Sequence, residues 1–136
     1  MNIKRFVAAS LAVFVVSQIL EFLIHGVLLK ATYDSLKHLW RPDMQSKMWI
    51  VSLVGFITSF LFTYIFVRGY EGKGILEGVR FGVIIGLFTS IPMAYGMYMM
   101  IAIPYSLALQ WFVYGMAEAI VLGIVAALIY KPAASA

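Results

Sequence analysis

Apolar residues gather along this chain in four long blocks, and short polar segments separate them. The blocks cover about 6–29, 48–67, 75–101 and 105–130. A bilayer core takes about 20 helical residues to cross, so each block is long enough to form one span. The pattern predicts an all-α membrane protein, in which residues 1–136 form a single four-helix transmembrane bundle.

The polar connections differ in length and chemistry. Residues 30–47, KATYDSLKHLWRPDMQSK, are expected to form a short interfacial segment between the first two spans. Trp40, Arg41 and Trp49 are predicted to form a belt there, because aromatic and basic side chains favour the headgroup zone. The second connection, RGYEGKG at 68–74, is a glycine-rich turn. Pro104 separates the last two spans, since one helix over both would far exceed the bilayer thickness.

Composition supports the same location. The chain is 63% hydrophobic and 12% charged, too few charged side chains to cover a soluble domain of this size. Its net charge of +4 is typical of a bacterial membrane protein and suggests anionic lipid headgroups as partners, with no nucleic acid. There is no cysteine, which excludes disulfides and thiolate sites.

The lysines and arginines predict an orientation. Six lie on the side of the N-terminus and four on the other: Lys4, Arg5, Arg68, Lys73, Arg80 and Lys131 against Lys30, Lys37, Arg41 and Lys47. Basic residues in short loops favour the cytoplasm, so this small excess places both termini in the cytoplasm. We expect the bacterial inner membrane.

Polar residues inside the spans form stripes at helical spacing. Glu21 and His25 lie one turn apart in the first span, and Glu118 lies near the middle of the fourth. An acidic side chain in a span costs a few kcal/mol on insertion scales, so it turns inward and finds a partner. We therefore predict one buried polar core built from Glu21, His25, Glu118, Gln18, Gln110 and Tyr114.

Two interpretations of this core stay open. It is either a proton relay or ligand site, or a hydrogen-bond network that fixes the register of the helices. No cofactor is predicted. A di-iron site needs Glu-x-x-His on two helices, whereas here one Glu-x-x-x-His occurs, and haem lacks a second histidine because His38 lies in the polar segment.

Small residues mark one face of the third span. Gly78, Gly82 and Gly86 recur every four residues, a spacing that lets membrane helices approach closely. Pro92 lies further along the same span and predicts a kink, with the hydroxyls of Thr89 and Ser90 able to satisfy the freed carbonyls.

Four segments make nearly the whole chain resemble a set of small bacterial four-helix membrane proteins to which no activity is attached. They are EFLIHGVLL, HLWRPD, FVRGYEGKGILEGVRFG and IPYSLALQWFVYG. The resemblance implies the fold and a membrane location alone.

Three functions fit the sequence. The first is a non-enzymatic membrane protein, either an oligomer or a subunit of a larger membrane complex, as the glycine face suggests. The second is a small proton-coupled carrier or channel-like protein that uses Glu21, His25 and Glu118. The third is a cofactor-binding or lipid-modifying membrane enzyme, although no catalytic motif lies outside the spans.

Overall fold

The computed structural model describes residues 1–131, which are helical and contain no strand. The all-α fold is therefore confirmed. In chain order the elements are α1 (Ile3–Leu23), the π-helical turn η1 (Ile24–Leu28), α2 (Lys30–Ser35), η2 (Lys37–Leu39), η3 (Gln45–Lys47), α3 (Trp49–Arg68), α4 (Ile75–Met100) and α5 (Tyr105–Ile129). Within the described chain, four segments are long and apolar enough to cross a membrane: Ile3–Leu28, Gln45–Arg68, Ile75–Met100 and Tyr105–Ile129. The chain is thus a four-helix integral membrane protein.

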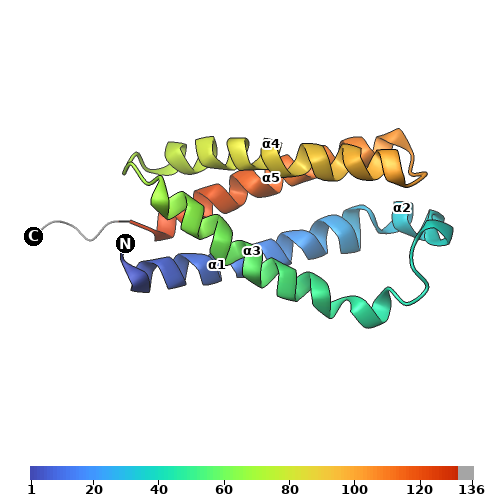
Figure 1. The fold of residues 1–136 in the computed structure, drawn as a ribbon, viewed down its shortest axis with the longest axis horizontal. Helices are drawn as coiled ribbons and strands as arrows, with labels where there is room; N and C mark the ends of the chain where they lie inside the picture. Colours follow the sequence, from blue (N-terminus) through green and yellow to red (C-terminus); the bar gives the residue numbers. More distant parts are fainter. Residues whose placement is uncertain (132–136) are drawn as a thin grey trace, which may run out of the picture.

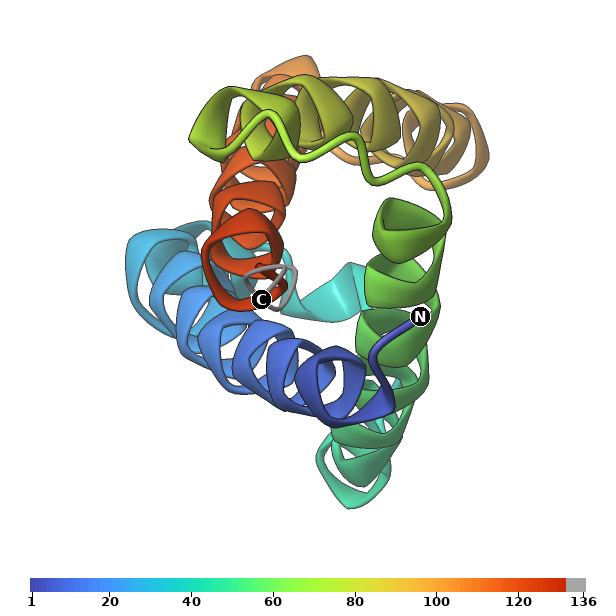
Figure 2. The ribbon, with the colours of Figure 1, turned by 90° about the vertical axis from the view of Figure 1, so that its left-hand side faces the viewer.

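The four long helices run antiparallel to their neighbours along the chain (Figure 1). Viewed along the bundle, their order around it is α3, α1, α5 and α4 (Figure 2). α4 packs most extensively on α5, α1 joins α5 to α3, and α3 makes little contact with α4. The start of α1 and the end of α5 lie at the same end, where the backbone N–H of Asn2 donates to the Tyr130 hydroxyl at 3.2 Å.

Two apolar clusters close the two ends of the bundle. The cluster near the start of α1 consists of Ala9, Val13, Phe66, Leu122, Ala126, Ala127 and Tyr130. The cluster near α2 consists of Ile24, Leu29, Ala94, Ile103, Leu107, Ala108 and Trp111. Glu21 on α1 and Glu118 on α5 lie between these two clusters.

The glycine face of α4 packs directly on α5. A Cβ atom added to Gly78 would lie 2.3 Å from the carbonyl oxygen of Gly123, and one added to Gly82 would lie 2.5 Å from that of Ala119. At Gly86 the nearest atom is the sulfur of Met116, at 2.9 Å. This glycine series therefore lets two helices of the same chain touch through their backbones.

The helix continues through Pro92 without interruption to Met100. One turn earlier, the Thr89 hydroxyl donates to the carbonyl oxygen of Ile85 at 2.9 Å. Hydroxyl groups of this kind stabilise a helix around a proline in the membrane. The kink at Pro92 stays a prediction.

Glu77 closes the turn between α3 and α4. Its side chain is only 4% exposed, and its two carboxylate oxygens accept the backbone N–H groups of Glu71 and Lys73 at 2.6 and 2.8 Å. Gly72 and Gly74 have φ near +75°, which lets the chain turn back toward this carboxylate. The sequence pattern predicts the turn, but it does not indicate that Glu77 holds it.

The glycine contact generates a stability prediction. Replacing Gly82 by Ala should lower the free energy of unfolding by about 1–3 kcal/mol, because the new methyl group must push α5 away. Thermal unfolding in detergent measures the effect. Gly96→Ala is the matched control on the same helix, since a Cβ there meets nothing within 4 Å. Equal stability of the two variants would contradict the tight contact.

Candidate functional site

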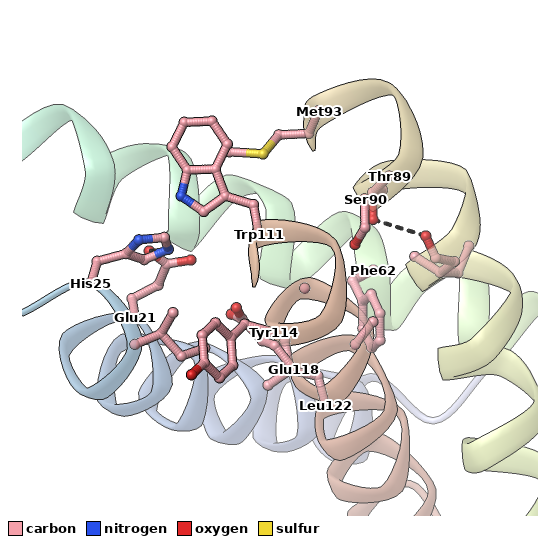
Figure 3. A pocket seen from close by; sticks show the side chains of 14 residues that line it. Glu21, His25, Phe62, Thr89, Ser90, Met93, Trp111, Tyr114, Glu118 and Leu122 are labelled. Atoms are coloured by element: carbon pink, nitrogen blue, oxygen red, sulfur yellow. Dashed lines mark hydrogen bonds and ion pairs between the residues drawn. The ribbon is translucent and has the colours of Figure 1, made fainter. Parts of the chain in front are cut away.

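Two adjoining cavities lie between the four long helices. The first, of about 310 Å³, is lined mainly by α4 and α5, and the second, of about 370 Å³, mainly by α1 and α3. They share four lining residues: Glu21, Phe62, Glu118 and Leu122. Figure 3 shows Glu21 and His25 on one side of the first cavity, with Trp111 and Glu118 of α5 opposite them. The first cavity therefore brings Glu21, His25 and Glu118 together.

Glu21 and His25 come from the last turn of α1 and the π-helical turn that follows it. Nε2 of His25 lies 3.5 Å from a carboxylate oxygen of Glu21, and each side chain is about one third exposed. The wider turn is closed by the backbone N–H of Leu29, which donates to the carbonyl of Ile24 at 2.9 Å. Single π-helical turns inside α-helices occur frequently at functional sites.

Trp111 and Tyr33 connect His25 to the interfacial segment. The Trp111 indole nitrogen donates to the Tyr33 hydroxyl at 2.7 Å, and the same hydroxyl is hydrogen-bonded to Nδ1 of His25. Burial raises the pKa of Tyr33 to about 12, against an opposing effect of the Trp111 hydrogen bond, so the hydroxyl keeps its proton at neutral pH.

The donors and acceptors in this chain define the state of the imidazole. Because an indole N–H only donates, all three groups are satisfied when the Tyr33 hydroxyl accepts from Trp111 and donates to Nδ1 of His25. The neutral imidazole then carries its proton on Nε2, the nitrogen that faces Glu21. The structure thus aligns two hydrogen bonds that lead from Trp111 and the interfacial segment to His25, whose Nε2 lies 3.5 Å from a carboxylate oxygen of Glu21.

Glu118 reaches the same space from α5. It lines both cavities, as Glu21 does from α1. None of the described residues that line either cavity is a lysine or an arginine. Two carboxyl groups without a basic side chain beside them make the cavity a place of negative charge, which attracts cations.

Gln18 and Tyr114 also lie at the cavities. Gln18 lines the second cavity, where its amide oxygen accepts a hydrogen bond from the Ser52 hydroxyl of α3 at 3.0 Å. Tyr114 lines the first cavity, next to Trp111. These two polar side chains are thus close to Glu21 and Glu118, as the stripes predict.

The prediction is wrong for Gln110, which is exposed and lines neither cavity. Each step of four residues turns about 40° past a full helical turn. Gln110 therefore lies about 80° away from Glu118 around α5. A spacing of exact fours winds around the helix and does not follow one face.

Sequence reasoning missed Trp111 and Tyr33 as site residues. Trp111 precedes Glu118 by seven residues, close to two full turns, so helical spacing could have placed the two side chains on one face. Tyr33 carries no such signal, because its position depends on how the interfacial segment folds back over the end of α1.

The three predicted belt residues have different surroundings. Trp49 is 64% exposed, whereas Trp40 is half-buried and donates to the carbonyl oxygen of Tyr33 at 3.2 Å. Arg41 is exposed and donates to Asp43 at 3.0 Å. Hydrogen bonds from Lys47 and Arg41 hold the pKa of Asp43 below its usual range. The Trp40 hydrogen bond thus holds α2 in place, together with Tyr33, whose hydroxyl is hydrogen-bonded to His25.

The described residues contain no group of three His, Cys, Asp or Glu side chains that could hold a metal ion. Comparison with protein-family models, curated proteins and solved structures finds no match to this chain. Fold and site together define the class: a four-helix integral membrane protein with an acidic cavity inside the bundle.

The Tyr33 hydroxyl generates the second prediction. Tyr33→Phe removes the acceptor of Trp111 and the partner of His25, so it should lower the free energy of unfolding by about 1–3 kcal/mol. It should also shift the fluorescence of Trp111. Tyr98→Phe is the control, because among the described residues the Tyr98 hydroxyl has no hydrogen bond. A Tyr33→Phe variant as stable as this control would show that the two hydrogen bonds are not formed.

Proposed function

We propose that this protein is a small proton-coupled carrier of the bacterial inner membrane, with Glu21, His25 and Glu118 as its exchange site. One observation supports this most directly: two carboxyl groups from different helices and one imidazole line the same cavity within the spans. Ionisable residues inside membrane spans mark proton and ion pathways. A carrier of this kind needs no domain outside the membrane.

A comparison within the chain favours exchange over a purely structural role. Glu77 is a structural carboxylate, since both its oxygens accept backbone N–H groups and its side chain is almost fully buried. Glu21 and Glu118 instead border open volume in two cavities. A carboxyl group beside open volume can exchange its proton with water or a solute, whereas the Glu77 carboxylate is held by the fold.

His25 supplies the route by which a proton reaches the carboxyl groups. Its Nε2 faces Glu21, its Nδ1 is bound to Tyr33, and its side chain is one third exposed at the α2 end of the bundle. The titratable groups that face this site are Glu21 and His25 from α1 and η1, Tyr33 from α2, and Tyr114 and Glu118 from α5. The described residues of α3 and α4 that line the cavities are uncharged.

A second candidate is an oligomer or a subunit of a larger membrane complex. The glycine face of α4 does not support it, because α5 of the same chain already covers that face. The observation in its favour is the exposure of α3. Of the residues in the most apolar 18-residue stretch of this span, 17% are buried, against 28% in each of the other three spans. Another copy or subunit packing on α3 would complete that cover.

Proton exchange provides the third prediction. In vesicles with an imposed pH gradient, the parent protein should speed the decay of the gradient above the leak of protein-free vesicles, and Glu118→Gln should lower this protein-dependent part by about 100-fold. Gln keeps the shape and hydrogen bonding of the side chain but cannot release a proton. Asp34→Asn is the control, since Asp34 is exposed and paired with Lys30 and Lys37 at the α2 end. Unchanged decay with a folded Glu118→Gln protein would assign the carboxyl groups a structural role.

The proposed orientation is tested separately. If both termini are cytoplasmic, reporter fusions at Lys37 and Lys73 should report opposite sides of the membrane, with Lys37 external. The two residues lie in connections at opposite ends of the bundle. A swapped pair of signals would reverse the orientation, and matching signals would contradict the four-span arrangement.

A further inference from the structure

We infer that the cavities take a lipophilic monovalent cation, an amine or quaternary ammonium compound with apolar substituents, which enters from the lipid between α3 and α4. The inference rests on the proposed function, because the cation and the exchanged proton share Glu21 and Glu118. It goes further in naming the chemical class of the solute and its route into the protein.

Charge is the first argument. The charged side chains that line the cavities are carboxylates, accompanied by one histidine, and no described lining residue is a lysine or an arginine. Arg80 of α4 lies outside the cavities and forms an ion pair with Glu71 at 3.2 Å. An anionic solute would meet repulsion from Glu21 and Glu118, whereas a cation is attracted by them and can exchange for a proton there.

The walls of the cavities are the second argument. Trp111 and Phe62 line the first cavity, and Met93 adds a polarizable thioether. Aromatic faces attract organic cations, most strongly where water is excluded, and methionine adapts to irregular apolar shapes. Inorganic ions prefer a shell of oxygen ligands, and the described residues contain no three-residue metal group. The walls therefore fit a cation that carries apolar groups.

The size of the space agrees with such a solute. Volumes of about 310 and 370 Å³ lie at the lower end of the range of small-molecule sites, about 300–1,000 Å³. The two cavities meet at Glu21 and Glu118, so a cation placed there has apolar space on both sides.

The arrangement of α3 and α4 provides the entrance. The helices meet near their connecting turn, where the rings of Phe62 and Phe66 contact that of Phe81 at centroid distances of 4.8 and 5.3 Å. From there they diverge toward the other end of the bundle (Figures 1 and 2). Val54 on α3 and Met93 on α4 line the cavities, and about half of each side chain is exposed. A lipid-soluble solute can therefore reach the carboxyl groups without leaving the membrane.

Binding tests the class of the solute. Tetraphenylphosphonium is titrated into the purified protein in detergent, with tetraphenylborate as an anion of matched shape and triphenylphosphine oxide as a neutral probe. The phosphonium should bind, and binding should strengthen with pH by up to about tenfold per unit, because one proton leaves for each cation bound. Glu118→Gln and Glu21→Gln should each abolish the pH dependence, while Asp34→Asn should keep it.

The route is tested with a matched pair of substitutions on α3. Val54 and Leu53 are neighbours with similar exposure, 51% and 48%, but of the two only Val54 lines one of the two cavities described above. In nanodiscs, Val54→Trp should slow phosphonium association at least several-fold, whereas Leu53→Trp should leave it unchanged. Equal rates in both variants would overturn lateral entry.

The outcomes separate this inference from the proposed function. The inference that the solute is a cation is overturned if tetraphenylborate or the neutral probe binds as tightly as the phosphonium. It is also overturned if phosphonium binding does not depend on pH. If Glu118 still controls the decay of a pH gradient, the proton-exchange function survives that result. If the phosphonium binds with the expected pH dependence but no proton crosses the membrane, the cavity is a cation-binding site and the carrier function fails.

Discussion

The backbone contact between α4 and α5 is the constraint on which the rest of the structure depends. With Gly78 against Gly123 and Gly82 against Ala119, these helices approach more closely than side chains larger than hydrogen allow. The face of α5 that carries Ala119 is thereby fixed toward α4, and the adjacent Glu118 turns toward α1. α4 and α5 are thus the more closely packed half of the bundle, and the Glu118 carboxyl group lies on it.

The other half of the bundle, α1 and α3, is less extensively packed than α4 and α5. α1 packs on both α3 and α5, whereas α3 depends on α1 and on aromatic contacts near its own connection to α4. The two apolar clusters close the ends of the bundle and leave the middle to Glu21, Glu118 and their neighbours. Where side chains of α3 and α4 do not meet, the polar centre borders the surface that faces lipid. The carboxyl groups and the proposed opening toward lipid therefore lie at the same depth along the bundle.

Sequence reasoning predicted the features that follow from the membrane itself. Span lengths follow from bilayer thickness, and the inward direction of Glu21 and Glu118 follows from the penalty of a charge in hydrocarbon. It failed where the result depends on tertiary arrangement. Gln110 was assigned to the core by a spacing that drifts around α5, and Tyr33 enters the site only because Trp40 and the π-helical turn fold α2 back. Nor does the glycine spacing alone say that α5 of the same chain covers α4.

The short link between α4 and α5 has a consequence for how the protein assembles. Only Ile101–Pro104 separates two helices that touch through their backbones, so each finds its partner as soon as both have entered the bilayer. Contacts between segments so near in sequence lose little entropy when the loop between them closes, so they form early. α1 precedes α5 along the chain, so the surface that α1 binds on α5 is absent until α5 has been made. The acidic site is thus completed only when α5 brings Glu118 opposite Glu21.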